Sequence, residues 1–183
     1  MELHSATGPL SPPASPIQLR PVIGVATAAL MIAALVHFGP TAQAIGAAFI
    51  LAIVAIVTVV DLEQRRIPNR IVLPATAVVL VVQTALDPSR APTLIAFSLA
   101  AGLFFYLPML IFRGGMGMGD VKLAVFLGAA LAEVVALAIA VAVLAAFVAA
   151  LVVLFRNGAA GRKSAMAFGP FLALGAAVAI FIG

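Results

Sequence analysis

The sequence contains no cysteine and only two histidines, His4 and His37. Without cysteine there can be no disulfide, no cysteine nucleophile and no thiolate zinc site. The histidines lie in an N-terminal tail and at the end of an apolar run, so a histidine-based metal site is not expected either. We therefore expect this chain to work without a metal or another cofactor.

Charge is equally scarce. Only 9% of the 183 residues are charged and 65% are hydrophobic, whereas a typical soluble domain carries roughly 25% charged residues. No soluble fold of this length could bury so much apolar surface, so the composition predicts a polytopic membrane protein in contact with the lipid bilayer. The apolar runs are long, which favours helices over the short alternating segments of a β-barrel. The predicted fold class is an all-α membrane bundle of about seven transmembrane helices.

The chain divides into a short tail and one membrane domain. Residues 1–20 are rich in proline, serine and alanine and predict a disordered cytosolic tail. Residues 21–183 form the membrane-embedded domain. Its predicted helices are 22–38, 42–60, 71–86, 93–112, 120–132, 133–155 and 165–182.

Two parts of this helix assignment have alternatives, namely the region 120–155 and the first apolar run. A single helix over 120–155 would be about 54 Å long, against a hydrocarbon core of about 30 Å. We therefore expect a break near Ala132-Glu133. The first run could instead be a cleaved signal peptide, with Ala42-Gln43-Ala44 as the cleavage site, but its length and the atypical tail before it favour retention.

The basic residues predict the orientation. With the tail in the cytosol, nine of the ten lysines and arginines fall on the cytosolic side and only Arg90 falls outside. This bias follows the positive-inside rule and supports the seven-helix count. The net charge of +4 is therefore explained by topology, and no nucleic-acid partner is expected.

Two acids stand out against this apolar background. Asp61 follows one apolar run and Asp120 opens another, and the predicted topology places both at the cytosolic membrane face. Carboxylates at such positions are functional-site candidates. Two carboxylates that share a site hold one proton between them, so one can donate to a carbonyl oxygen while the other takes a proton from water. Alternatively, Asp120 is a helix cap and Asp61 pairs with Arg65 at the membrane boundary.

The helix dipole predicts which acid holds the proton. Asp120 lies at a helix N-terminus, which favours its anion, and Asp61 lies at a C-terminus, which favours its neutral form. On this basis Asp61 carries the proton in the resting state. Glu63 nearby is expected to form a local surface pair with Arg66.

Three motifs in order carry a resemblance to a known family. Asp61 is followed by Ile67-Pro68-Asn69, the segment 117–123 reads Gly-Met-Gly-Asp-Val-Lys-Leu, and 168–171 reads Phe-Gly-Pro-Phe. From residue 42 to the C-terminus the chain resembles the type IV prepilin peptidases, polytopic aspartic proteases with a Gly-x-Gly-Asp motif. Presenilin-like proteases share that motif, but here Val60 precedes the first aspartate, where they have tyrosine, and no Pro-Ala-Leu segment occurs.

The resemblance implies that Asp61 and Asp120 are the catalytic pair. The substrate would be a prepilin or pseudopilin, whose short basic leader is cut at the cytosolic face of the bacterial inner membrane. The candidate substrate-binding residues are Gly117, Gly119, Lys122, Pro68 and Asn69. The bare glycine backbone could pair with an extended substrate, and mobility is expected across 114–119. Two of these candidates have simpler interpretations, because a lysine can snorkel to the interface and an asparagine after proline can serve a turn.

The chain also departs from larger members of that family. Those carry a cytosolic domain with paired Cys-x-x-Cys zinc motifs between the first two helices, associated with N-methylation. Here only residues 39–41 separate the two runs. The chain thus resembles the short, peptidase-only form found with Flp-type tight-adherence pili, for which neither methyltransferase activity, zinc nor S-adenosylmethionine is expected. The alternative functions are an ion-coupled transporter and a non-catalytic pilus assembly scaffold.

Overall fold

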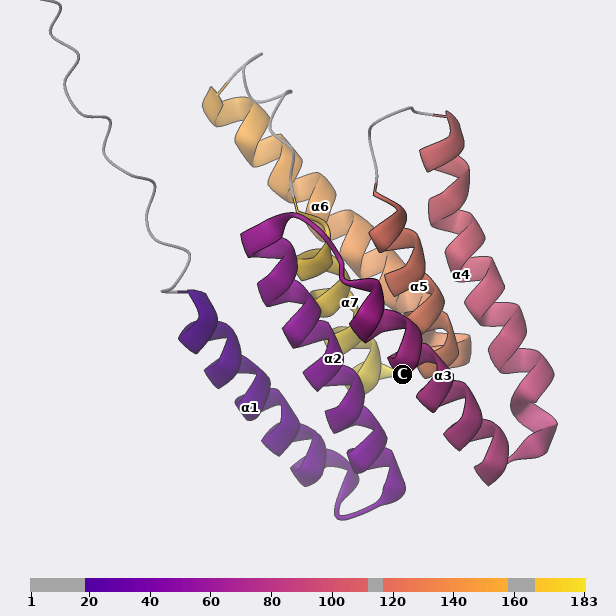
Figure 1. The fold of residues 1–183 in the computed structure, drawn as a ribbon. Helices are drawn as coiled ribbons and strands as arrows, with labels where there is room; N and C mark the ends of the chain where they lie inside the picture. Colours follow the sequence, from indigo (N-terminus) through magenta and orange to yellow (C-terminus); the bar gives the residue numbers. More distant parts are fainter. Residues whose placement is uncertain (1–18, 112–116, 158–166) are drawn as a thin grey trace, which may run out of the picture.

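The computed structural model describes residues 19–111, 117–157 and 167–183, which form seven α-helices and two short 3₁₀ helices (Figure 1). The elements are α1 (Leu19–Phe38), α2 (Ala42–Gln64), α3 (Asn69–Leu86), η2 (Pro88–Arg90), α4 (Ala91–Ile111), α5 (Met118–Leu131), η3 (Ala132–Val134), α6 (Val135–Asn157) and α7 (Gly169–Ile182). Within the described ranges the predicted all-helical bundle is confirmed. The predicted glycine loop lies mostly outside them, and so does the N-terminal tail, except that its last two residues already belong to α1.

Helix α2 is longer than predicted, and this changes the position of Asp61. The helix begins after Thr41, whose hydroxyl accepts a hydrogen bond from the Ala44 N–H at 3.4 Å. It ends at Arg65, which adopts a left-handed conformation with φ 51° and donates its N–H to the Asp61 carbonyl. Such a residue closes a helix by satisfying its last carbonyls. Asp61 therefore lies in the last turn of α2, not beyond its end.

The predicted break between α5 and α6 is confirmed. Ala132 has φ 47° and ψ −119°, which no α-helix can contain. The chain reverses at η3, so that α6 runs back toward the end of the bundle at which α5 begins (Figure 1). The packing partners are α4 with α5, α6 with α7, α1 with α2, α2 with α7, and α3 with α5.

Glycines allow two of these pairs to approach closely. A Cβ at Gly128 of α5 would lie 2.6 Å from the Cα of Ser98 in α4. A Cβ at Gly175 of α7 would lie 2.9 Å from the carbonyl carbon of Ala138 in α6. Small residues at helix contacts are typical of membrane bundles, where van der Waals packing holds the helices together.

The Gly128→Ala substitution should therefore destabilise the bundle by about 1–3 kcal/mol, because the added methyl group meets backbone atoms that cannot rotate away. Thermal unfolding in detergent would measure this. Gly46→Ala in α2 is the matched control, since nothing lies within 4 Å of the added Cβ and alanine favours a helix by about 1 kcal/mol over glycine. An equal melting temperature for the two variants would contradict the close α4–α5 contact.

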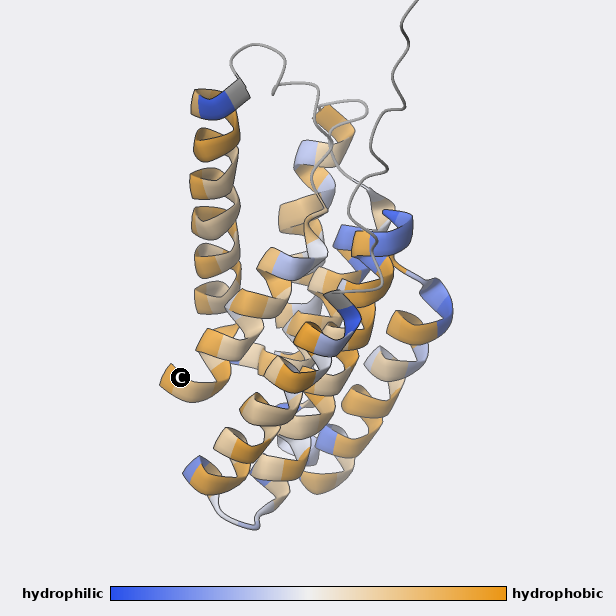
Figure 2. Cartoon of the chain, turned by 90° about the vertical axis from the view of Figure 1, so that its left-hand side faces the viewer, coloured by the Kyte–Doolittle hydropathy of each residue, from blue (hydrophilic) through white to orange (hydrophobic). Residues whose placement is uncertain are grey.

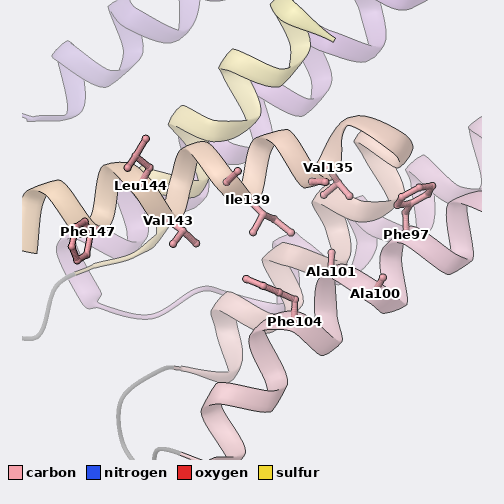
Figure 3. A pocket seen from close by; sticks show the side chains of 11 residues that line it. Phe97, Ala100, Ala101, Phe104, Val135, Ile139, Val143, Leu144 and Phe147 are labelled. Carbon is pink, nitrogen blue, oxygen red and sulfur yellow. The ribbon is translucent and has the colours of Figure 1, made fainter.

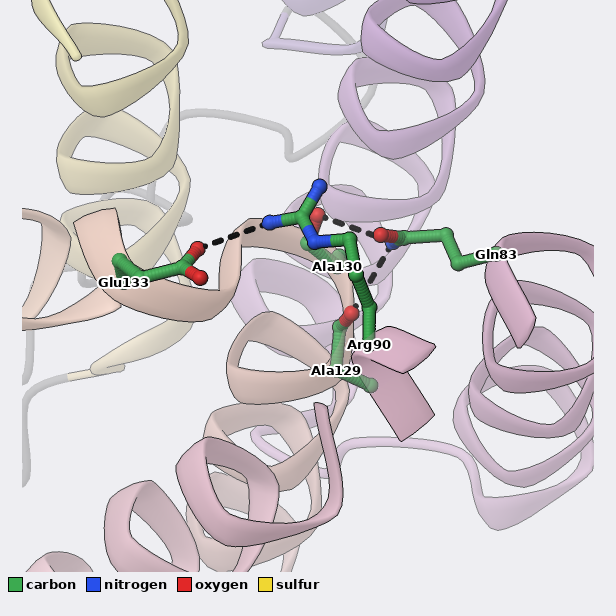
Figure 4. Close-up of polar contacts among 5 residues, drawn as sticks. All are labelled: Gln83, Arg90, Ala129, Ala130 and Glu133. Carbon is green, nitrogen blue, oxygen red and sulfur yellow. Dashed lines mark hydrogen bonds and ion pairs between the residues drawn. The ribbon is translucent and has the colours of Figure 1, made fainter. Parts of the chain in front are cut away.

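Polar contacts define the two ends of the bundle. At one end Gln83 donates hydrogen bonds to the carbonyls of Ala129 and Ala130 at 3.0 and 3.2 Å, and Arg90 pairs with Glu133 at 2.9 Å (Figure 4). These contacts fix the turn between α5 and α6 against the α3–α4 connection.

At the other end α1 is tied to α2 by an ion pair, in which Arg20 Nη2 donates to Glu63 Oε2 at 2.7 Å. The prediction that Glu63 pairs with Arg66 was wrong. The start of α1 lies beside the end of α2, so an arginine 43 residues away is available to this carboxylate.

The helices have the length and composition of membrane spans. Within the ranges that the structure describes, five segments are long and apolar enough to cross a membrane, namely 20–38, 42–64, 69–86, 88–111 and the broken 118–156. Figure 2 shows hydrophobic residues along the helices and most hydrophilic ones near helix ends. The chain is therefore an integral membrane protein with a polytopic helical bundle.

Candidate active site

Two short helices begin inside the bundle. Helices α5 and α7 have 14 residues each, whereas their neighbours α4 and α6 have 21 and 23. At the far end the last residue of the chain, Gly183, lies against Val134 of η3, so both short helices end at the level of this turn. At about 1.5 Å per residue their N-termini are recessed by on the order of 10 Å from the ends of α4 and α6. Figure 1 shows the start of α5 below both ends.

Asp61 lies against one of these recessed N-termini. Its side chain is only 5% exposed, and its Oδ2 accepts a hydrogen bond from the backbone N–H of Gly169, the first residue of α7, at 2.9 Å. The sequence explains why α7 begins there, since Pro170 is favoured in the first helical turn, where its missing N–H costs nothing. Phe168 anchors the start by packing its ring on Phe105 of α4 at 5.5 Å.

This contact requires glycine at position 169, because there is no room for a side chain. A Cβ there would lie 2.8 Å from Asp61 Oδ2 and 3.2 Å from Asp61 Cβ. Only glycine allows the α7 backbone to reach the carboxylate. A helix N-terminus and its free N–H groups stabilise a negative charge, so the start of α7 offers a hydrogen-bond donor to a carboxyl group at this position.

Asp120 lies at the other recessed N-terminus. Gly117 is the N-cap of α5, and the Asp120 carboxylate reaches back to accept its N–H at 3.3 Å. The helix-cap interpretation of Asp120 is thus partly correct, although the residue lies in the first turn and not at the cap position. The hydrogen bond is long and Asp120 is only half-buried, so its carboxyl group can also reach a bound molecule.

The fold brings the two acids together. Gly119, next to Asp120, packs on Ile67 in the connection that follows Asp61, and a Cβ there would lie 2.7 Å from Ile67 Cβ. Both carboxyl groups therefore lie at one end of the bundle, on helix ends that meet through the contact between Gly119 and Ile67. Among the described residues, no three acidic or histidine side chains gather into a group that could hold a metal ion.

The candidate substrate-binding residues lie around this pair but make different contacts. Lys122 Nζ donates to Asn69 Oδ1 at 2.9 Å, which ties α5 to the first residue of α3. Pro68 is the N-cap of α3. Gly119 is occupied by its contact with Ile67, which gives this glycine a packing role. Lys122, Asn69 and Gly119 are thus held by contacts between different elements of the fold.

Gly117 differs from the other candidates in the space around it. It is exposed, and a Cβ there would meet only Asp120 Oδ2 at 3.7 Å and Gly119 N at 3.9 Å. The space beside Gly117 is therefore open, while its N–H and its carbonyl are both hydrogen-bonded to Asp120. Residues 112–116, where the rest of the predicted glycine loop lies, are outside the described ranges.

Gly169 is the site residue that the sequence did not reveal. The Phe-Gly-Pro motif marked the start of a helix, but its partner Asp61 lies 108 residues earlier in the chain. The prediction that Asp61 holds the proton considered only the helices that carry the two acids. The N-terminus of α7, whose Gly169 N–H touches the Asp61 carboxylate directly, comes from a part of the chain that this prediction did not consider.

An apolar cavity lies away from this site. It has a volume of about 590 Å³ and lies between α4 and α6, lined by side chains such as Phe97, Phe104, Ile139 and Phe147 (Figure 3). Its lining contains no ionisable or hydroxyl side chain, so it can hold apolar groups but offers nothing for acid–base chemistry.

Known proteins match this chain across the same region. Residues 48–155, which include both aspartates, match the family model described as "Type IV leader peptidase family". Two relatives named "Prepilin leader peptidase/N-methyltransferase", from Burkholderia pseudomallei strains 1026b and K96243, are each 31% identical over 176 residues. The match covers 92% of this chain but only 57% of each relative. No solved structure matches significantly. Since the family model covers more than half of the chain, this protein belongs to the type IV leader peptidase family.

Proposed function

We propose that this protein is a membrane aspartic endopeptidase that removes the leader from type IV prepilins or pseudopilins. The observation that carries the proposal is the pair of carboxyl groups, Asp61 and Asp120, at the recessed end of the bundle. Family membership and the printed names of the relatives support leader cleavage as the reaction. The chain spans 57% of those relatives, so the activity of the longer proteins is assigned to it here only as a proposal.

In the proposed mechanism Asp61 is the base and Asp120 is the acid. The Gly169 N–H stabilises the Asp61 anion, which takes a proton from water as the water oxygen bonds to the scissile carbonyl carbon. Protonated Asp120 donates its proton to the carbonyl oxygen. The C–N bond then breaks, the amine takes the proton from Asp61, and the new hydroxyl group returns one to Asp120. This proposal reverses the proton assignment that was predicted from the helix ends carrying the two acids.

The site would face the cytosol, as the basic residues predict. The leader of a prepilin carries positive charge, and the acids of this site would meet it before the apolar pilin helix. The recessed N-termini of α5 and α7 would require the scissile segment to be extended, because peptide bonds within a helix are closed to attack by water.

We further propose a Flp-type substrate and peptidase activity without methyl transfer. The relatives' names include an N-methyltransferase, but this chain has no cysteine and only residues 39–41 between α1 and α2. Cysteine-based zinc motifs of the kind associated with that second activity are therefore impossible in this chain.

Co-expression with a candidate Flp-type prepilin tests the proposal. The expected result is a mature pilin that lacks its leader and carries an unmodified N-terminal amine by mass spectrometry. A prepilin expressed alone is the control for cleavage by the host. An uncut leader across several prepilins would contradict the protease and favour a scaffold, whereas ion-dependent transport by the purified protein in vesicles would favour a transporter. A methylated N-terminus would contradict the peptidase-only assignment.

A further inference from the structure

One buried hydroxyl group of the bundle has no partner. Thr58 in α2 is only 7% exposed, and its Oγ1 is the single buried side-chain N or O atom without a hydrogen bond among the residues that the structure describes. A buried polar group left unsatisfied costs about 1–3 kcal/mol, so such groups are rare and commonly hold a water molecule.

Other hydroxyl side chains within these helices form a hydrogen bond to the backbone of their own helix. Thr27, Thr76 and Ser98 each donate to the carbonyl four residues earlier, at 2.7 to 2.8 Å. That bond is open to any helical threonine or serine. Thr58 does not form it, although it is more deeply buried than Thr27 or Thr76. Its hydroxyl is therefore available for another partner.

The position of Thr58 identifies that partner. Thr58 precedes Asp61 by three residues on the same buried face of α2. Side chains at this spacing have Cβ atoms about 5–6 Å apart. The Asp61 Oδ2 atom is taken by Gly169, and its Oδ1 has no hydrogen bond to any residue in the described ranges. Because the two side chains are neighbours on one helix face, a single water molecule about 2.8 Å from each could bridge the Thr58 hydroxyl and the free Asp61 oxygen.

We propose that Thr58 Oγ1 and the Asp61 carboxylate together bind one water molecule, and that Thr58 is a positioning residue for the water used in hydrolysis. The inference rests on the proposed protease function and names a further residue for it. The hydroxyl accepts or donates one hydrogen bond to the water, while Asp61 is the group that takes its proton. The missing bond to the α2 backbone leaves the hydroxyl unpaired until the water is bound.

Thr58→Val is the test variant, because valine matches the shape of threonine and removes only the hydroxyl. We expect kcat for prepilin cleavage to fall by about 10- to 100-fold, the value of one hydrogen bond in a charged site, with KM changed less than twofold. The melting temperature in detergent should stay equal or rise, since an unsatisfied buried group is lost. Thr58→Ser keeps the hydroxyl and should restore most of kcat. Thr76→Val, which removes a hydroxyl already bonded to the Val72 carbonyl, should leave kcat unchanged.

Several results would overturn this inference. Full kcat in Thr58→Val would exclude a role in positioning water. A parallel loss of stability and activity that Thr58→Ser also showed would indicate simple packing. An experimental structure of the wild-type protein at high resolution provides a readout that needs no substrate, and an empty space within 3.2 Å of Thr58 Oγ1 would contradict the bound water. A wild-type protein that cuts no prepilin but holds this water would instead count against the proposed function alone.

Discussion

Asp61→Asn and Asp120→Asn should each lower prepilin cleavage by about 10³-fold or more while the protein still folds and inserts. General acid–base groups contribute about 10²- to 10⁴-fold each, and neither half of the proposed mechanism can proceed alone. Asparagine has nearly the same shape, and in Asp61→Asn its amide oxygen can still accept the Gly169 N–H. Cleavage in co-expression and in purified protein would measure the loss, and melting temperature would report the fold.

Asp87→Asn is the matched control for both variants. Asp87 lies at the opposite end of the bundle, where its exposed side chain caps η2 by accepting from the Ser89 N–H at 3.1 Å. Asparagine caps a helix about as well as aspartate, so neither stability nor cleavage should change. Activity that survives in either site variant would contradict the two-acid mechanism, and an equal loss in Asp87→Asn would indicate a general effect of removing charge.

Gly169→Ala should lower cleavage by about 10²-fold or more, although this residue has no side chain to take part in chemistry. The added methyl group would lie 2.8 Å from Asp61 Oδ2, so either the carboxylate or the start of α7 must move. A displacement of about 1 Å at a catalytic group can cost 10²-fold in rate. The same displacement weakens the hydrogen bond from the Gly169 N–H to Asp61, which the proposed mechanism requires, so kcat should fall more than KM rises. Steady-state kinetics with purified prepilin would measure both.

Two other glycines provide controls for this variant. Gly24→Ala in α1 adds a methyl group with nothing within 4 Å and should behave as wild type. Gly175→Ala places its Cβ 2.9 Å from the Ala138 carbonyl carbon, in the middle of the α6–α7 contact, and should lower the melting temperature. A Gly169→Ala protein that kept wild-type kcat would show that α7 does not position Asp61. One that lost activity only in proportion to its stability would resemble Gly175→Ala and count against a local role.

The recessed N-termini of two short helices determine the surroundings of the two carboxyl groups in the proposed site. Helices α5 and α7 each direct a positive N-terminal end toward one of the carboxyl groups, and the surrounding helices limit access by water. Both features favour acid–base chemistry in a low-dielectric site. The same arrangement explains why α5 and α7 need glycine at or near their first residues, because Gly119 and Gly169 pack directly on the α2–α3 connection and on α2.

Much of this protein was determined by the sequence alone. The scarcity of charge requires a membrane environment, and the run lengths predict seven helices, including the break at Ala132 that membrane thickness demands. The two acids were also identifiable, because a carboxylate beside an apolar run is costly and so rarely incidental. These conclusions depend on composition and on short-range pattern, which any unfolded chain already contains.

The tertiary structure decided the partners of those acids. Contacts between Gly169 and Asp61, Lys122 and Asn69, and Arg20 and Glu63 join residues 108, 53 and 43 positions apart. Helices such as α4 and α5 are apolar around their whole circumference, so no polar face shows which side meets a neighbour. The neighbours of each helix are instead selected by the packing of small residues. This packing depends on how closely two helix backbones can approach, which the sequence does not reveal. Only the folded bundle therefore places a helix N-terminus against Asp61 and leaves Thr58 without a partner beside it.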